Sequence, residues 1–324
     1  MKPQAADIIV VGASAGGVEV LRRLVSDLSA ELDAAVLIVM HVLPEAESLL
    51  PEILDKASGM PALQAENGAP VETGKIYIAP PDRHLMFQNG NLRVVRGPKE
   101  NRHRPSIDVL FRSAAMTYGP RVVGVVLSGS DDDGTAGLMA IKRHGGLTVV
   151  QDPDDSEYSR MPSSAAEAVR PDFVLPIAQI GQVLVDLVEG HMGKVEKKTT
   201  SKPEDKTLSE TAEGAVTDVK LLGTPSAFTC PDCNGTLWEL EDGDVLQYRC
   251  RVGHTYSPGT MLDAEAEVVE RALWAAVRTL EESAAVSRRI AQKSVVLREQ
   301  LSRQAVEREE HARVIRELLL QRTD

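Results

Sequence analysis

The N-terminal part of the chain alternates between short apolar runs and helical patterns of apolar residues. Buried strands are indicated by apolar, mostly β-branched runs at residues 8–11, 35–40, 75–79, 121–127, 148–151 and 173–175. Helical spacing separates these runs, as in Val18, Leu21, Leu24, Val25 and Leu28. Strands that are apolar throughout and alternate with helices predict a doubly wound α/β fold with a mostly parallel sheet.

Other patterns add a hairpin and three further segments. Asn89-Gly90-Asn91 lies between two short strand patterns and predicts a β-hairpin. We expect the α/β domain to span residues 1–190 and to be followed by a flexible linker at 191–218, where large apolar residues nearly vanish. Residues 219–257 hold all three cysteines, and residues 258–324 have a long helical pattern. Such a length predicts a coiled coil or a helical hairpin.

Composition then removes several classes of function. Aromatic residues make up 3% of the 324 residues, and the formal net charge is −12. Both values disfavour binding to nucleic acid or to anionic membranes. Apolar runs fall short of the roughly 18–20 residues of a membrane span, and the N-terminus lacks a signal-peptide pattern. Since three cysteines would leave one thiol unpaired in an oxidising compartment, we expect a cytoplasmic protein.

Three chemically active side chains follow predicted strands. Ser14 lies in the turn Gly12–Gly17, His41 follows the second strand, and Asp133 lies in the polar loop after residues 121–127. Parallel sheets place their sites at these strand ends, and a serine, an imidazole and a carboxylate can form a nucleophilic triad. Alternatives stay open for each residue. Ser14 could be a turn residue or part of an anion-binding turn, His41 a structural residue, and Asp133 a helix N-cap.

Competing sites have weaker support in the sequence. The Ser14 turn lacks the G-x-G-x-x-G spacing of dinucleotide-binding folds, and the Gly-Lys-Ser/Thr of a P-loop is absent from the sequence. The run Asp131–Asp133 could suggest a metal, but three adjacent carboxylates do not converge on one ion. We therefore expect no cofactor for catalysis.

Five ordered motifs give the chain a family resemblance. They are Gly12–Gly17, Met40–His41, Ile78–Leu85, Asn101–Phe111 and Leu127–Gly134. Together they resemble the catalytic domain of chemotaxis protein-glutamate methylesterases over about residues 7–190. The resemblance implies hydrolysis of glutamate methyl esters on chemoreceptor signalling domains, with release of methanol, and deamidation of receptor glutamines. It also implies that Ser14 is the nucleophile, His41 the general base and Asp133 the orienting carboxylate.

Some positions depart from the family pattern. Ala15 replaces the usual threonine, and Ser130 and Asp131 replace a Met-Gly pair in the acid-bearing loop. We expect backbone N–H groups near Ala15, Gly129 and Ser130 to stabilise the oxyanion. A carboxylate at Asp131 would oppose negative charge that develops nearby, and so lower activity or change substrate preference.

Two arginines and two histidines within these motifs have further candidate roles. Arg102, His103 and Arg104 could attract acidic receptor helices, or the arginines could pair with carboxylates of their own domain while Ser106 caps a helix. His84 is interpreted as structural.

The C-terminal cysteines predict a metal site. Cys230, Cys233, Cys250 and His254 form a C-x₂-C…C-x₃-H pattern, which is typical of structural zinc in a ribbon of two strands at residues 237–240 and 247–249. Free buried thiols are the alternative. Four protein ligands would leave no open position for catalysis. Acidic residues around the pattern favour protein contact over nucleic acid.

The sequence also bears on how the protein is regulated and on its partners. The catalytic strand begins near Asp7, so we expect no N-terminal receiver domain of the kind that usually regulates these esterases. The helical tail could form a homo-oligomer, dock on a receptor or another signalling protein, or cover the site. The leading hypothesis is an active esterase for methylated chemoreceptors. The alternatives are a weakened receptor-binding adaptor and a hydrolase for a receptor outside motility.

Overall fold

The computed structural model describes residues 7–45, 48–191, 223–242 and 245–321. The predicted linker therefore lies outside the described residues except for its first one. The chain forms two compact units, Met1–Met261 and Leu262–Asp324. The first unit contains both the predicted α/β domain and the cysteine-bearing segment. The second consists of the helical tail beyond its first turn.

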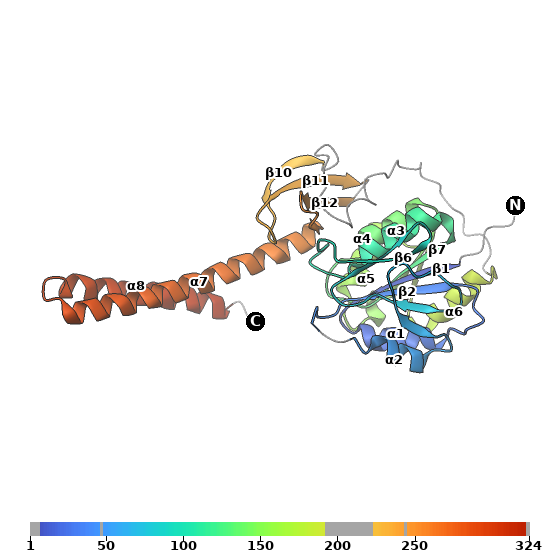
Figure 1. Cartoon of the computed structure of the whole chain (residues 1–324), viewed down its shortest axis with the longest axis horizontal. Coiled ribbons are helices and arrows are strands. Elements are labelled where there is room, and N and C mark those ends of the chain that lie inside the picture. The colour runs from blue at the N-terminus through green and yellow to red at the C-terminus, as the bar shows by residue number, and fades with distance from the viewer. Residues whose placement is uncertain (1–6, 46–47, 192–222, 243–244, 322–324) are drawn as a thin grey trace. The chain divides into compact units, whose positions relative to one another are not determined.

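The first unit contains a seven-stranded sheet in which every neighbouring pair of strands is parallel (Figure 1). Its spatial order is β3 (Ala62–Gln64), β4 (Ile76–Ile78), β2 (Ala35–Met40), β1 (Ile8–Ala13), β7 (Val122–Val126), β8 (Leu147–Gln151) and β9 (Phe173–Leu175). Six of these strands match the predicted ones, and the three-residue edge strand β3 was too short to show a pattern. From β1 the sheet is built first on one side, through β2, and later on the other side, through β7. The strand order therefore reverses beside β1, where α/β sheets place their ligand crevice.

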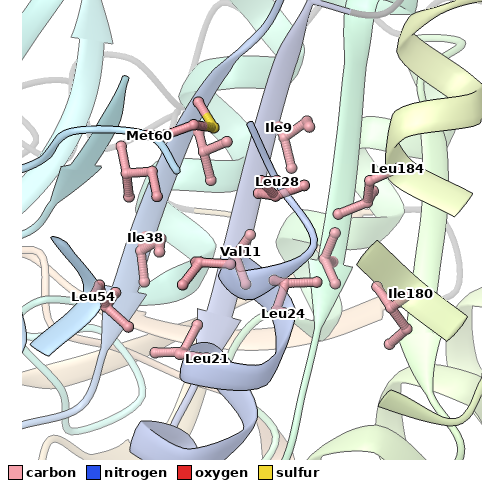
Figure 2. Close-up of a cluster of buried hydrophobic side chains, with 14 of the residues drawn as sticks. Ile9, Val11, Leu21, Leu24, Leu28, Ile38, Leu54, Met60, Ile180 and Leu184 are labelled. Carbon is pink, nitrogen blue, oxygen red and sulfur yellow. The ribbon is translucent and has the colours of Figure 1, made fainter. Parts of the chain in front are cut away.

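Helices cover both faces of this sheet, as predicted. On one face lie α1 (Gly17–Ser26), α2 (Leu50–Ala57) and α6 (Ile177–Val188). Figure 2 shows Leu21 and Leu24 of α1, with Leu28 just after the helix, packed against Ile9, Val11 and Ile38 of the sheet. Alternate residues of β1, Ile8 and Val10, belong to the core of the opposite face, because successive side chains of a strand point to opposite sides.

The opposite face is covered by α3 (Ile107–Tyr118), α4 (Thr135–Arg143) and α5 (Arg160–Val169), with short 3-10 helices at Gly119–Arg121 and Pro153–Asp155. Beside them the strands β5 (His84–Gln88) and β6 (Asn91–Val95) form the predicted hairpin. Asn89 and Gly90 at its turn have φ values of 53° and 81°. Both are left-handed, as the tight hairpin turn requires.

A small antiparallel sheet follows in the same unit. It contains β10 (Thr224–Thr229), β11 (Thr236–Asp242), β12 (Val245–Cys250) and β13 (Thr255–Tyr256). The central pair β11 and β12 corresponds to the two predicted ribbon strands. We call this sheet, with its cysteines, the ribbon. Trp238 lies on β11, and the second tryptophan of the chain, Trp274, lies on the tail helix α7 (Pro258–Lys293).

The tail is a helical hairpin, one of the two predicted alternatives. The helix α7 ends at Lys293, and α8 (Arg298–Leu320) returns along it. Val277 of α7 packs with Ala312 and Leu319 of α8, and an ion pair joins Arg316 to Glu281 across the two helices. Within the described ranges, none of the helices combines the length and the apolarity that a membrane crossing requires.

Candidate active site

Ser14 lies in the turn between β1 and α1. Its backbone N–H donates to Ser128 O at 2.9 Å, which joins the turn to the loop after β7. Gly16 stands at the N-terminus of α1 with φ 72°, a left-handed conformation that glycine adopts without strain. The turn therefore exposes a half-buried serine hydroxyl beside a helix N-terminus, as the sequence predicts.

The three predicted triad residues come together at the carboxyl ends of the sheet. His41 Nδ1 lies 3.1 Å from Ser14 Oγ, and His41 Nε2 lies 2.9 Å from Asp133 Oδ2. The side chain of Asp133 is fully buried, and that of His41 is 7% exposed. With Nε2–H donating to Asp133, Nδ1 is free to accept the proton of Ser14, so the imidazole can act as a general base.

Asp133 is held by several donors besides His41. Its carboxylate accepts hydrogen bonds from Ile107 N at 2.6 Å, Ser106 Oγ at 2.9 Å and Asn101 Nδ2 at 3.0 Å. Burial alone would raise the pKa of Asp133, but the hydrogen bond and charge of His41, the charge of His103 and the Asn101 bond lower it well below its ordinary value. Asp133 is therefore a carboxylate at neutral pH.

The helix α3 explains the position of that carboxylate. Ser106 occupies the N-cap position of α3, as predicted, but its hydroxyl donates to Asp133 instead of capping the helix. The N–H groups of the first turn point at Asp133, and a helix N-terminus stabilises negative charge. The alternative in which Asp133 is a helix N-cap therefore describes the structure in part, at α3 and not at the following helix α4, where Gly134 has that position.

Asp108 makes the reciprocal contact from the first turn of α3. Its Oδ1 accepts from Gly134 N at 3.0 Å and from Gly137 N at 2.6 Å, at the start of α4. Burial and the charge of Asp133 raise the pKa of Asp108 well above its ordinary value. Two buried carboxyl groups thus lock the ends of α3 and α4 around the loop that carries Asp133.

His103 and Asp131 lie against the base. The His103 ring stacks on His41 with centroids 3.5 Å apart and an interplanar angle of 6°. His103 Nε2 is 2.5 Å from Asp131 Oδ2, which is also 4.0 Å from His41 Nδ1. Burial would raise the pKa of Asp131, but the hydrogen bond from His103 and the charges of both histidines lower it. An anionic group therefore lies close to the nitrogen that faces Ser14.

The predicted oxyanion donors differ in availability. Gly129 N donates to Tyr158 O at 2.9 Å, so this N–H is already used. A β-carbon added to Gly129 would lie 3.0 Å from Ser14 Cβ, which shows how closely this loop approaches the nucleophile. Within the part of the chain that the structure describes, the N–H groups of Ala15 and Ser130 have no acceptor. Ala15 and Ser130 therefore stay as the candidates.

Comparison with known proteins identifies the region that carries this geometry. The family model for the CheB methylesterase matches residues 9–184, which is more than half of the chain and includes all three triad residues. The chain belongs to the CheB methylesterase family.

Relatives of the CheB family agree with this assignment. A putative protein-glutamate methylesterase/protein-glutamine glutaminase of Leptospira interrogans is 35% identical over 187 residues, which cover 57% of this chain and 97% of that protein. A protein-glutamate methylesterase/protein-glutamine glutaminase of Methanosarcina mazei is 36% identical over 195 residues, 58% of this chain and 53% of its own. The chain thus spans about half the length of the second relative.

A solved structure shares the fold. The crystal structure of the Thermotoga maritima CheB methylesterase catalytic domain covers 57% of this chain and 100% of its own, at 33% identity and a TM-score of 0.55. The doubly wound α/β fold predicted from the hydrophobic pattern is therefore confirmed for the N-terminal part.

Other predicted residues of the CheB domain have structural contacts. Arg104 donates to Asp82 Oδ1 at 2.8 Å and to the backbone oxygen of Gly97. This matches the alternative in which the arginines pair with their own domain, whereas Arg102 is half-buried in the same loop. His84 is fully buried, and its two ring nitrogens lie at Pro98 O and Ser106 N, in line with the structural role predicted for it.

The acidic run beside the triad does not converge. Asp131 bonds His103, Asp132 bonds Ser257 and Asp133 bonds His41. Each carboxylate has its own partner, as expected for adjacent residues. A shared metal site is therefore not supported there.

The cysteines of the ribbon do converge. The ligand atoms of Cys230, Cys233, Cys250 and His254 all lie within 4.8 Å of one another. Cys230 Sγ and Cys250 Sγ are 3.6 and 3.5 Å from His254 Nδ1, and Cys233 Sγ is 3.6 Å from Cys250 Sγ. A tetrahedral ion with Zn–S bonds of about 2.3 Å and Zn–N bonds of about 2.0 Å separates its ligand atoms by about 3.5–3.8 Å. The donor set therefore fits zinc.

Sequence reasoning did not assign three residues that hold the site. Asn101 and Ser106 bond Asp133, and His103 stacks on His41. All three belong to the motif Asn101–Phe111, which carried the resemblance but received no role in catalysis. The available signal was a polar run directly before a helix, since a helix N-terminus is where a buried carboxylate is stabilised.

Proposed function

We propose that the chain hydrolyses glutamate methyl esters on the signalling domains of chemoreceptors, releases methanol, and deamidates receptor glutamines by the same chemistry. The observation that carries this proposal is the Ser14–His41–Asp133 geometry inside the CheB-type domain. The named relatives are protein-glutamate methylesterases/protein-glutamine glutaminases, which supports this substrate class.

The residues suggest a two-step acyl transfer. Ser14 Oγ attacks the ester carbonyl carbon while His41 Nδ1 takes its proton, and the ionised Asp133 stabilises the imidazolium. His41 then protonates the departing methoxide, which leaves as methanol. A water molecule repeats the sequence on the acyl-enzyme and frees the glutamate. The N–H groups of Ala15 and Ser130 would donate to the oxyanion at each step.

The test is methanol release from a methylated receptor by the full chain. Ser14→Ala should lower turnover about 10⁴-fold or more, because the nucleophile is lost. Ser26→Ala removes an exposed hydroxyl of α1 that bonds only its own helix, and serves as the matched control. Methanol release by Ser14→Ala at the parent rate would exclude the mechanism. Mass spectrometry of the receptor would detect glutamine converted to glutamate.

A weakened enzyme that acts as a receptor-binding adaptor is the second candidate. It is favoured by Asp131, whose carboxylate lies 4.0 Å from His41 Nδ1 and would oppose negative charge beside Ser14. Receptor capture without methanol release would support the adaptor, and methanol release at enzymatic rates would exclude it.

We further propose that Cys230, Cys233, Cys250 and His254 hold one structural zinc ion. The convergence of four donor atoms supports it, and so does the short antiparallel sheet, which offers little core of its own. Cysteine thiolates that bind metal must stay reduced, which supports a cytoplasmic location. Elemental analysis of the full chain should find stoichiometric zinc that Cys233→Ser lowers. A zinc-free wild-type chain would contradict the proposal.

A further inference from the structure

The ribbon meets the catalytic loops at one short corner. This corner is Thr255–Thr260, where β13 ends and α7 begins. Its backbone pairs with the loop before α3, since Asn101 N donates to Thr255 O at 2.7 Å and Thr255 N to Lys99 O at 3.3 Å. Both partners belong to the same compact unit. The corner therefore contacts the loop that supplies Asn101 to the triad carboxylate.

Asn101 connects the corner to Asp133 through both ends of its side chain. The amide nitrogen donates to Asp133 Oδ1 at 3.0 Å and to Asp108 Oδ2 at 2.8 Å. The amide oxygen accepts from Ser257 N at 2.9 Å and from Thr260 Oγ1 at 3.3 Å. With 2% exposure, the side chain has no alternative partner in water. The ribbon corner thus fixes the orientation in which Asn101 faces the catalytic carboxylate.

Ser257 makes a second connection through Asp132. Its hydroxyl donates to Asp132 Oδ2 at 2.5 Å and accepts from Thr260 N at 3.1 Å, so the serine caps α7 and contacts the catalytic loop at once. A β-carbon added to Gly259 would lie 3.0 Å from Asp132 Oδ2. Asp132 precedes Asp133 in the chain, so the corner also holds the backbone of the triad residue.

A buried arginine of the ribbon lies at its contact with the loop before α3. The side chain of Arg249 on β12 is fully buried, and its Nε donates to Thr255 Oγ1 at 3.1 Å. Glu100, in the loop before α3, forms a parallel β-bridge with Thr255, the residue to which Arg249 donates. An ionised side chain is costly to bury, so the ribbon and this loop form one packed structure.

We propose that the ribbon corner is part of the active site, and that Ser257 and Thr260 are positioning residues that hold Asp133 through Asn101 and Asp132. The proposal rests on the esterase function proposed above. The proposed metal ligand His254 directly precedes Thr255, so metal bound to the ribbon would set the position of the corner. The ribbon then supports catalysis from outside the CheB-type domain, without touching the substrate.

The test uses the full chain and compares Ser257→Ala with Ser257→Thr. Ser257→Ala removes the hydroxyl bonded to Asp132, so we expect kcat for methanol release to fall about tenfold with KM changed less than twofold, as for a loss of about 1.4 kcal/mol felt in the transition state. Ser257→Thr keeps the hydroxyl and should restore kcat. Ser302→Ala, an exposed serine of α8, is the control.

Two readouts do not need the receptor. Amide hydrogen exchange of Ile107, whose N–H donates to Asp133 Oδ2, should speed up in Ser257→Ala and in metal-depleted wild type. Labelling of Ser14 by a fluorophosphonate should slow in the same samples. If the wild type labels but releases no methanol, the proposed function fails and the positioning role is still measured.

The outcomes are separable. Slower labelling and faster Ile107 exchange, both reversed in Ser257→Thr, support the proposal. Unchanged labelling and exchange in Ser257→Ala would overturn it, as would faster labelling, which would mean that the corner restrains the site. Zinc content measured in each variant distinguishes a lost contact from an unfolded ribbon.

Discussion

At the scale of single residues, Asp131 and His103 most distinguish this site from a simple triad. The His103 ring covers one face of the His41 imidazole and binds the Asp131 carboxylate. That carboxylate is 4.0 Å from the nitrogen that must accept the Ser14 proton. His103 thus holds the Asp131 carboxylate, which would otherwise compete with His41 for the Ser14 hydroxyl. This contact offsets the effect of the negative charge that Asp131 adds beside the nucleophile.

His103→Ala tests this arrangement. Without its partner, the Asp131 carboxylate is free to compete with His41 Nδ1 for the Ser14 hydroxyl, so kcat/KM should fall about tenfold, a coupling of the size found between contacting residues. Removing the carboxylate as well, in His103→Ala/Asp131→Gly, should recover most of the loss. Steady-state methanol release from the four members of this cycle gives the coupling. Equal losses in the single and double variants would contradict it.

At the scale of elements, the loops around the hairpin β5–β6 are held by ion pairs. Asp82, before β5, accepts from Arg104 in the loop before α3 and pairs with Arg96 after β6 at 2.7 Å. Burial alone would raise the pKa of Asp82, but the two guanidinium groups lower it below its ordinary value of 3.8. The ion pair of Arg104 with Asp82 therefore stabilises the loop that places Asn101 and His103 at the site.

Asp82→Asn should destabilise the fold by about 1–2 kcal/mol at pH 7, the range for charge-assisted hydrogen bonds. Because the folded pKa is lowered, the stabilisation is fully present above about 3.8 and is lost as the pH falls through the folded value. Urea unfolding at pH 7, 5, 4 and 3 should therefore show the two proteins converging only in acid. Asp33→Asn, at an exposed aspartate, is the control. A constant difference at every pH would refute the linkage.

The elements also show what the sequence could predict. Ser14 and His41 directly follow buried parallel strands, so their meeting could be inferred from the pattern alone. Asp133 lies seven residues beyond β7, and its environment depends on α3, which no local pattern connects to it. The break between α7 and α8 has no glycine or proline to mark it, and the contacts of Asn101 join residues 156 positions apart. These features are set by tertiary packing.

At the scale of the whole molecule, the two compact units have separate cores. The core of the hairpin consists of residues from α7 and α8, including Val277, Ala312 and Leu319. Ion pairs also join the two helices, such as that of Arg288 on α7 with Glu309 on α8. The hairpin can therefore be disrupted by changes that touch no residue of the α/β domain.

Val277→Asp places a carboxylate at a position that is 2% exposed, and should destabilise the hairpin by about 3 kcal/mol or more. Circular dichroism should show a loss of helix at a lower temperature than in the wild type. Val296→Asp, at a position that is 91% exposed between the two helices, should leave the melting curve unchanged. Methanol release should persist in both. A loss of activity in Val277→Asp that Val296→Asp does not share would contradict this and show that the hairpin core matters for catalysis.

The placement of the two tryptophans has an optical consequence. Trp238 lies on the ribbon and Trp274 on the tail, so neither fluorophore belongs to the α/β domain that carries Ser14. Selective excitation of the indoles therefore follows the ribbon and the hairpin, whereas tyrosine emission comes from the α/β domain, through Tyr77, Tyr118 and Tyr158, as well as from the ribbon. If removal of metal shifts the indole emission and slows Ser14 labelling over the same range, tryptophan fluorescence can be used to follow the state of the ribbon while the active site is measured.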